Sequence, residues 1–323
     1  DGAVGAAGTA TSVAGIPLFT ADNSIYTHDV SGTDNTASFN TAYGIGALGA
    51  ITDGDQSVAI GYGAGDATTT GRVLAIGKDA AGANTTGGAI IAIGDTAYDA
   101  ADTENYNIAI GTDALGGAVA GGEYNVAVGH FSLDALTSGD ANTVIGYNAG
   151  GALTGATNNV IIGHLAGDAL QTGSSNTIIG DNAVGVGVLT GGNNVVMGRN
   201  AGEDLTSAAS NVIIGVDAAK QGTTSENNVV IGTNAQGSGI ATGNNNVVLG
   251  YGAGFDMTSG ADNVAIGVNA GKEITIGAYS TLVGRNAGAE MIEERLTAVG
   301  YYAGGNTTGN LNNYFGFNCG SGN

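Results

Sequence analysis

The sequence predicts an all-β protein, a parallel β-solenoid (β-roll) with about 17 residues per coil and about 16 coils. Three observations lead to this fold class. Gly makes up 61 of the 323 residues and Pro only one, and Gly this frequent disfavours helices. A glycine that closes a short apolar segment returns at intervals of 16 to 18 residues, and the residues around it repeat in fixed columns. A period near 17 is too short for a helix pair or a propeller blade.

The 17 closing glycines, called anchor glycines below, span most of the chain. They are residues 44, 61, 77, 94, 111, 129, 146, 163, 180, 198, 215, 232, 250, 267, 284, 300 and 316. We expect an N-terminal non-repeat segment over residues 1–39, which forms a cap or an assembly arm. The solenoid domain is predicted over 40–316, and a short tail over 317–323.

Each repeat is expected to contain a strand that ends at its anchor. The residue one before the anchor is apolar in every repeat, and the residue three before it is mostly Val, Ile, Leu or Thr. Residues two apart on a strand share a face, and β-branched residues suit a packed pleated surface. We therefore expect these two columns to face the coil interior, and a second short strand and two turns to complete each coil.

A column of asparagines lies four residues before the anchors. It is unbroken over ten repeats: Asn107, Asn125, Asn142, Asn159, Asn176, Asn194, Asn211, Asn228, Asn246 and Asn263. In stacked coils these side chains form a ladder of amides that bond to the coils above and below. The column three after the anchor is Ala in 15 of 17 repeats, with Ser132 and Cys319 as the exceptions. The lone cysteine is therefore interpreted as a small packing residue.

The column two before the anchor is also apolar in every repeat. By strand alternation it faces away from the other two columns, so it is predicted to lie outside the coil and to be covered by another chain. The residues predicted for this oligomer interface are Val144, Ile161, Ile178, Val196, Ile213, Val230 and Val248.

The net charge of the chain limits the classes of partner that it can bind. Seven Lys and Arg against 28 Asp and Glu give a formal charge of −21. Such a chain lacks the basic patch that nucleic-acid binding needs, and an anionic membrane surface repels it. No apolar run approaches the roughly 20 residues of a membrane span.

Two repeats show a resemblance to known families. Asn107-Ile108-Ala109-Ile110-Gly111 is similar to the head repeats of trimeric autotransporter adhesins, and the segment from Asn142 to Gly150 resembles repeats of bacteriophage tail-fibre proteins. The resemblance covers about residues 40–320. It implies a left-handed roll, three chains around a common axis, an extracellular location on a cell surface or a virion, and adhesion to a surface or a receptor. The period of 17, however, is longer than the usual adhesin coil.

Candidate binding residues are few. His130, Tyr147 and His164 each follow an anchor in consecutive repeats, and this stripe is a candidate contact for a cell-surface glycan; the alternative is that they are exposed turn residues. No catalytic, cofactor-binding or metal residue is predicted. Calcium binding by the aspartates of the turns stays open, with solvated acidic turns as the alternative.

The sequence thus favours a structural or adhesive fibre protein, not an enzyme, that associates with copies of itself, and the resemblance implies a homotrimer. Alternatives are a subunit of a bacterial or archaeal extracellular filament and, more remotely, an ice-binding solenoid. The ice-binding alternative needs a flat exposed threonine array, and we expect the threonines not to align in one column.

Overall fold

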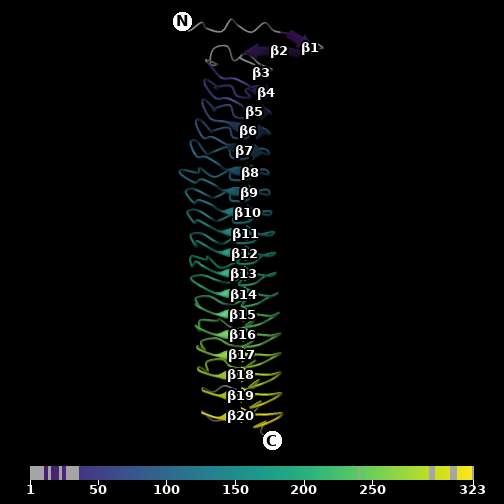
Figure 1. The fold of residues 1–323 in the computed structure, drawn as a ribbon, viewed down its shortest axis with the longest axis vertical. Helices are drawn as coiled ribbons and strands as arrows, with labels where there is room; N and C mark the ends of the chain where they lie inside the picture. The colour runs from purple at the N-terminus through teal and green to yellow at the C-terminus, as the bar shows by residue number, and fades with distance from the viewer. Residues whose placement is uncertain are drawn as a thin grey trace. The chain divides into compact units, whose positions relative to one another are not determined.

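The computed structural model describes residues 11–13, 16–21, 24–26, 36–238, 240–290, 295–305 and 311–321. Within these residues the chain is all-β and contains no helix. It forms two compact units, Asp1–Asn158 and Asn159–Asn323, and each is a stack of coils with one strand per coil (Figure 1). The solenoid class predicted from the sequence is confirmed.

In the first unit a small antiparallel arrangement precedes the coils. Strand β1 pairs with β2, and β2 with β3, in antiparallel fashion, and β3 then pairs in parallel with β4. From β4 to β10 every strand pairs in parallel with the next. The strands are β1 Thr11–Val13, β2 Ile16–Ala21, β3 Ser24–Tyr26, β4 Thr41–Tyr43, β5 Val58–Ile60, β6 Val73–Ile76, β7 Ile90–Ile93, β8 Ile108–Ile110, β9 Val126–Val128 and β10 Thr143–Ile145.

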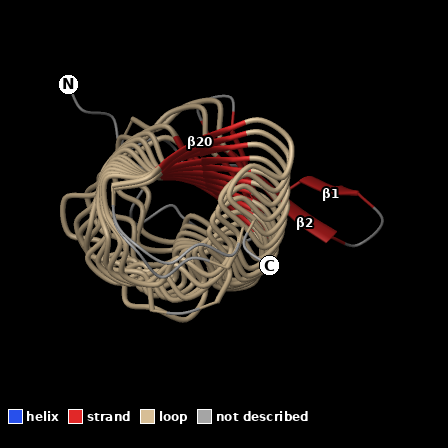
Figure 2. Cartoon of the chain, turned by 90° about the horizontal axis from the view of Figure 1, so that it is seen from below, coloured by secondary structure: helices blue, strands red, loops and turns tan. Residues whose placement is uncertain are grey.

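In the second unit ten strands pair in parallel in sequence order. They are β11 Val160–Ile162, β12 Thr177–Ile179, β13 Val195–Met197, β14 Val212–Ile214, β15 Val229–Ile231, β16 Val247–Leu249, β17 Val264–Ile266, β18 Thr281–Val283, β19 Thr297–Val299 and β20 Asn313–Phe315. The strands gather on one side of the coils, and irregular turns form the rest (Figure 2).

The anchor glycines stack on one another, and this explains why no other residue occupies the column. Gly215 has φ +141°, and a Cβ added there would lie 2.5 Å from the carbonyl oxygen of Gly232 in the next coil. A side chain would meet backbone that cannot move without breaking the strand pairing. The close stacking also fixes the register, because each coil contacts the next through the same residue.

The direction of the strand side chains is the reverse of the prediction. The column two before the anchor lies inside the coil, and the columns one and three before it lie outside. The predicted interface residues are at most 2 % exposed within the single chain, so assigning them to an oligomer interface was wrong. They are Val144, Ile161, Ile178, Val196, Ile213, Val230 and Val248.

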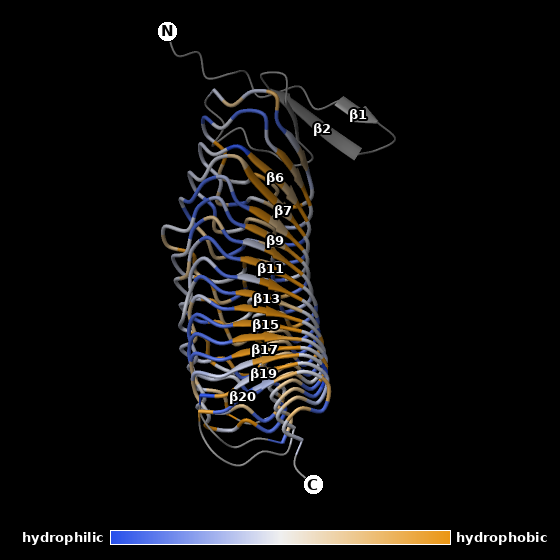
Figure 3. Ribbon diagram, turned by 60° about the horizontal axis from the view of Figure 1, so that its bottom comes forward, coloured by the Kyte–Doolittle hydropathy of each residue, from blue (hydrophilic) through white to orange (hydrophobic). Residues whose placement is uncertain are grey.

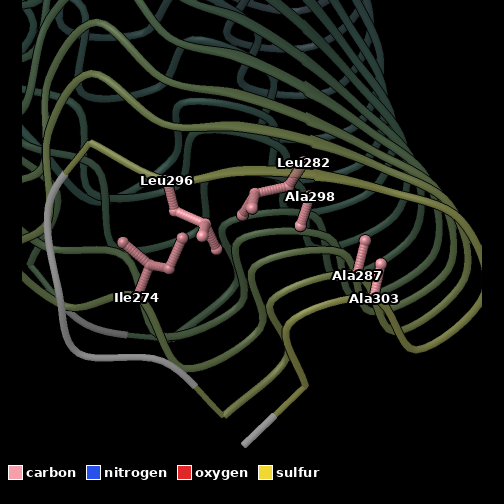
Figure 4. Packing of buried hydrophobic residues seen from close by; sticks show 6 residues of the cluster. All are labelled: Ile274, Leu282, Ala287, Leu296, Ala298 and Ala303. Atoms are coloured by element: carbon pink, nitrogen blue, oxygen red, sulfur yellow. The ribbon is translucent and has the colours of Figure 1, made fainter. Parts of the chain in front are cut away.

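The physical reason for the reversal lies in the other interior columns. The asparagines four before the anchor and the residues two before it share one face of the chain, since they are two residues apart. Both are buried, together with the alanines three after the anchor. A narrow coil needs small residues on its inner side, which Ala59, Ala109 and Ala127 provide. Figure 4 shows this packing in the second unit, where Leu282 and Ala298 from the strands lie close to Ile274 and Leu296.

The coil has one regular strand, not the two predicted. The opposite side is closed by single backbone hydrogen bonds and by isolated parallel bridges such as Ala209 to Glu226. Its turns use left-handed residues, which occur regularly two after and five before the anchor, as at Asn200 (φ 52°) and Asn193 (φ 61°). Asn is among the residues that tolerate this conformation, so the turns account for many asparagines outside the buried column.

Candidate functional site

The outward side of the strands is the main surface feature of both units. We call the side chains one and three residues before each anchor, in β4–β20, the outward face. They are largely apolar, and Figure 3 shows that the strands as a whole are hydrophobic. Ile60, Ile145 and Leu249 are each about 40 % exposed. These side chains are not fully exposed, because like side chains in adjacent coils partly cover one another.

Charge is excluded from the outward face. None of its residues in the 17 strands is Asp, Glu, Lys or Arg, although the chain carries 35 such residues. On a solvated β-surface, polar and charged residues alternate with the buried ones. The pattern here is apolar on both sides of the strand, which is typical of a sheet covered on both faces.

The column one after the anchor borders the outward face. It contains aromatic side chains, such as Tyr251 (57 % exposed) and the stacked pair Tyr301 and Phe317, whose ring centroids are 5.0 Å apart. It also holds three of the seven cations, Lys78, Arg199 and Arg285, but only two carboxylates, Asp95 and Asp181. The hydrogen-bonded Asp79 carboxylate, and then Asp95, raise the pKa of Lys78.

The asparagine ladder is present as an internal brace. The Asn176 side-chain oxygen accepts the backbone N–H of Asn194 at 3.0 Å, and the Asn194 side-chain oxygen accepts that of Asn211 at 3.1 Å. The Asn194 side-chain nitrogen donates across the coil to the carbonyl of Ala208 at 2.8 Å. The amides therefore join each coil to the next and also join the strand side to the opposite wall.

The brace is interrupted in the first unit and ends in the second. Val73 and Ile90 replace asparagine, and there the strands β6 and β7 each lengthen to four residues. Next to the gap, Asn107 donates to the hydroxyl of the buried Tyr98 at 3.1 Å, and burial raises the pKa of Tyr98. In the second unit the last link is made by Ser280, whose backbone N–H donates to the Asn263 side-chain oxygen at 2.9 Å.

The three glycan candidates take part in local contacts. His130 accepts the backbone N–H of Thr112 through Nδ1 at 3.2 Å, and Tyr147 packs edge-on against Phe131 with ring centroids 6.0 Å apart, both in the first unit. His164, in the second unit, lies 2.9 Å from the Asp181 carboxylate through Nδ1. The structure gives the geometry of each residue, and their role in glycan binding stays a prediction.

Three aspartates on the turns have pKa values above the ordinary value for Asp. Burial raises the pKa of Asp66, Asp99 and Asp204. Among the residues that the structure describes, no three His, Cys, Asp or Glu side chains gather where they could hold a metal ion. Cys319 is a partly buried free thiol in the small column, as its position in the repeat predicted.

The threonines form a column in the structure, so the prediction that they do not align in one column was wrong. In the second unit the backbone N–H of Thr190 bonds to the Thr206 carbonyl, and that of Thr206 to the Thr223 carbonyl. The hydroxyl of Thr206 also donates to the Thr223 carbonyl at 2.9 Å. The N–H of Thr223 bonds to the carbonyl of Ala241, and a second row of Thr242, Thr258 and Thr275 begins at the next residue, joined by the bonds of Thr242 and Thr258. Thr206, Thr223, Thr258 and Thr275 each lie eight residues after an anchor glycine, and only Thr190 and Thr242, in 18-residue coils, lie ten residues after one.

No helix that the structure describes is long and apolar enough to cross a membrane. The chain matches no protein-family profile and no curated protein.

Proposed function

We propose that this chain is a structural fibre protein whose copies associate side by side through the outward face. The main support for this proposal is that the outward face is largely apolar and free of charged residues in both units, although the chain as a whole has a formal charge of −21. The solenoid supplies length and a regular surface, and association covers the face that a single chain leaves exposed.

The size of the face supports association. The band from three residues before to one residue after the anchor covers about 60 Å² per coil, or about 600 Å² over ten strands, at the usual β-sheet spacings. Single proteins rarely expose apolar patches above a few hundred Å². Two such faces in contact bury about 1,200 Å² in total, which is at the lower end of the range for specific interfaces.

A second copy of the chain fits the charges better than another partner. The band carries three cations and two carboxylates, while 26 of the 28 Asp and Glu lie elsewhere. Two copies that meet through this band bury few like charges and keep their acidic surfaces in water, where mutual repulsion is screened. The family resemblance favours three copies, an extracellular location and adhesion at a cell surface or on a virion. A filament subunit is the alternative within the same structural class.

The test uses neighbouring isoleucines that point in opposite directions. Ile162, Ile179 and Ile214 lie on the outward face, and Ile161, Ile178 and Ile213 lie in the interior. Replacement of the outward set by Asp should give a folded monomer, whereas replacement of the inward set should unfold the second unit. Light scattering measures mass and circular dichroism measures folding.

Two results would overturn the proposal. One is a parent chain that is a monomer in solution. The other is an outward triple variant that keeps the mass of the parent while remaining folded.

The threonine column favours a second candidate, binding to an ice surface. Thr206, Thr223, Thr258 and Thr275 are partly exposed and repeat at the spacing of the coils. Such a row presents hydroxyl and methyl groups at a constant interval, as a crystal lattice requires. The purified chain should then inhibit ice recrystallisation, and Thr206→Lys with Thr223→Lys should abolish the effect. A parent chain without inhibition excludes this candidate.

A further inference from the structure

Two tyrosines in the first unit form an exposed aromatic platform. Tyr106 and Tyr124 lie five residues before successive anchors, with ring centroids 5.1 Å apart and planes inclined by 5°. Both are more than half exposed, at 54 % and 56 %. Neither is needed to fill the coil interior, so packing of the fold does not explain why this corner carries large aromatic side chains.

The left-handed backbone at these positions is a property of the coil. Tyr106 has φ 61° and Tyr124 has φ 60°, and the same column holds residues of every size in this conformation, for example Phe39, Ala141 and Leu311. The two tyrosines are therefore distinguished by the stacking of their rings and not by their backbone.

Hydrogen-bonded polar side chains lie one residue before the column that contains the two tyrosines. The Asn105 side-chain nitrogen donates to the Glu123 carboxylate at 2.9 Å, and the Asn105 oxygen accepts the backbone N–H of Gly88 at 2.9 Å. The Asp140 carboxylate accepts the backbone N–H of Glu123 at 2.8 Å. These bonds hold an amide and two carboxylates in place, and each carboxylate has four lone-pair sites with which to accept further hydrogen bonds.

We propose that Tyr106 and Tyr124, with Asn105 and Glu123, bind a neutral polysaccharide. The C–H face of a pyranose ring stacks on an aromatic ring, and its hydroxyl groups donate to carboxylate and amide oxygens. Tyrosine suits such a contact because its ring is large, rigid and amphipathic. Anionic sugars are disfavoured, because Glu123 and Asp140 and the net charge of −21 repel them.

This inference goes beyond the proposed function, since it gives the fibre a ligand class and does not depend on how the copies associate. The platform lies outside the predicted glycan stripe of His130, Tyr147 and His164, so the two sites can be tested separately.

The experiment compares Tyr106→Ala/Tyr124→Ala with Tyr279→Ala. Tyr279 occupies the same column at φ 60° and is 60 % exposed, but its ring lies beside Arg295, 5.8 Å from the guanidinium carbon, and not beside a second tyrosine. Alanine is compatible with the column, as Ala89 and Ala141 show. Both variants should therefore fold.

The probes are hexasaccharides of β-1,4-linked glucose, of β-1,4-linked N-acetylglucosamine and of α-1,4-linked glucose, with a galacturonate hexasaccharide as the anionic comparison. Calorimetry and saturation-transfer NMR measure binding. We expect at least one neutral probe to bind the parent and the Tyr279 variant with equal affinity, and to bind the double variant at least tenfold more weakly.

The proposal is overturned if no neutral probe binds the parent, if the anionic probe binds more tightly, or if the double variant binds like the parent. Light scattering on the same samples separates this inference from the proposed function. A double variant that loses self-association but keeps sugar binding shows that the tyrosines belong to an interface, and this also overturns the proposal. Loss of sugar binding with the mass of the parent retained supports it.

Discussion

Removal of one amide from the internal brace should destabilise the second unit far more than removal of its neighbour. Asn194 and Asn193 are adjacent residues of the same type, but Asn194 is buried and bonded on both sides, whereas Asn193 is an exposed turn residue. Replacement of each by Ala therefore changes the same atoms in opposite environments. Ala occurs naturally at the turn position in other coils, as at Ala89 and Ala141.

The hydrogen bonds allow the size of the effect to be estimated. Asn194→Ala leaves the backbone N–H of Asn211 without its acceptor at 3.1 Å and the carbonyl of Ala208 without its donor at 2.8 Å. Each buried unpaired group costs about 1–3 kcal/mol, so the free energy of unfolding should fall by about 2–6 kcal/mol. Asn193→Ala should change it by less than about 0.5 kcal/mol, as is usual for exposed positions.

Urea-induced unfolding of both variants measures the difference, and hydrogen exchange locates it. Because each coil of a solenoid contacts only its neighbours, the amide of Asn211 and those of the adjacent coils should lose protection, while distant coils keep theirs. If the two variants unfold within about 0.5 kcal/mol of each other, the amides do not act as a buried brace and this reasoning is refuted.

Two further predictions concern the anchors and the turns. Gly215→Ala should prevent correct folding of the second unit, because its Cβ would lie 2.5 Å from the Gly232 carbonyl oxygen at a φ of +141°; retention of the circular dichroism spectrum and the melting temperature of the parent would contradict it. Burial raises the pKa of Asp66, Asp99 and Asp204 above the ordinary 3.8, so the native state binds more protons than the unfolded state between the two values. Stability should therefore be highest on the acidic side and decrease as the pH rises through the raised pKa values. Replacement of all three by Asn should flatten this dependence in melting curves, and an unchanged slope would exclude these groups as its source.

The repeat itself could be predicted from the sequence because the same side chain meets its counterpart in the next coil. Gly215 and Gly232, or Asn194 and Asn211, have to be identical for the close stacking and the amide bonds to continue. Period, strand position and the buried amides therefore followed from column identities alone.

The inside and the outside of the strand could not be told apart by hydropathy, because Ile178 and Ile179 are equally apolar. The asparagines held the missing signal. An amide ladder contributes little unless it is shielded from water, and the residue two positions after each asparagine shares its face. Burial of Asn176 therefore implies burial of Ile178, and this leaves Ile179 outside. Alternation alone leaves either face of the strand as the interior, and only the position of the asparagines decides between them.

The tyrosine platform could not be predicted from column identity, whereas the threonine column could. Tyr106 and Tyr124 occupy a column of mixed residues that includes Phe39 and Ala141, so identity along the column does not reveal the pair. Thr206, Thr223, Thr258 and Thr275 each lie eight residues after an anchor glycine. Their alignment is therefore present in the sequence, and only the 18-residue coils displace Thr190 and Thr242 from it.

The like-with-like stacking of the anchors has a consequence for how such a chain changes in length. A coil between Asn107 and Asn263 can be duplicated or deleted in frame, because the new boundary again joins glycine to glycine and asparagine to asparagine. Each event alters the stack by one step of about 4.8 Å, and no compensating substitution is required elsewhere. The extra residues of the 18-residue coils leave the strand pairing unbroken, as between β8 and β9. The length of such a solenoid can therefore change during evolution in steps of one coil, while the cross-section of the coil is preserved.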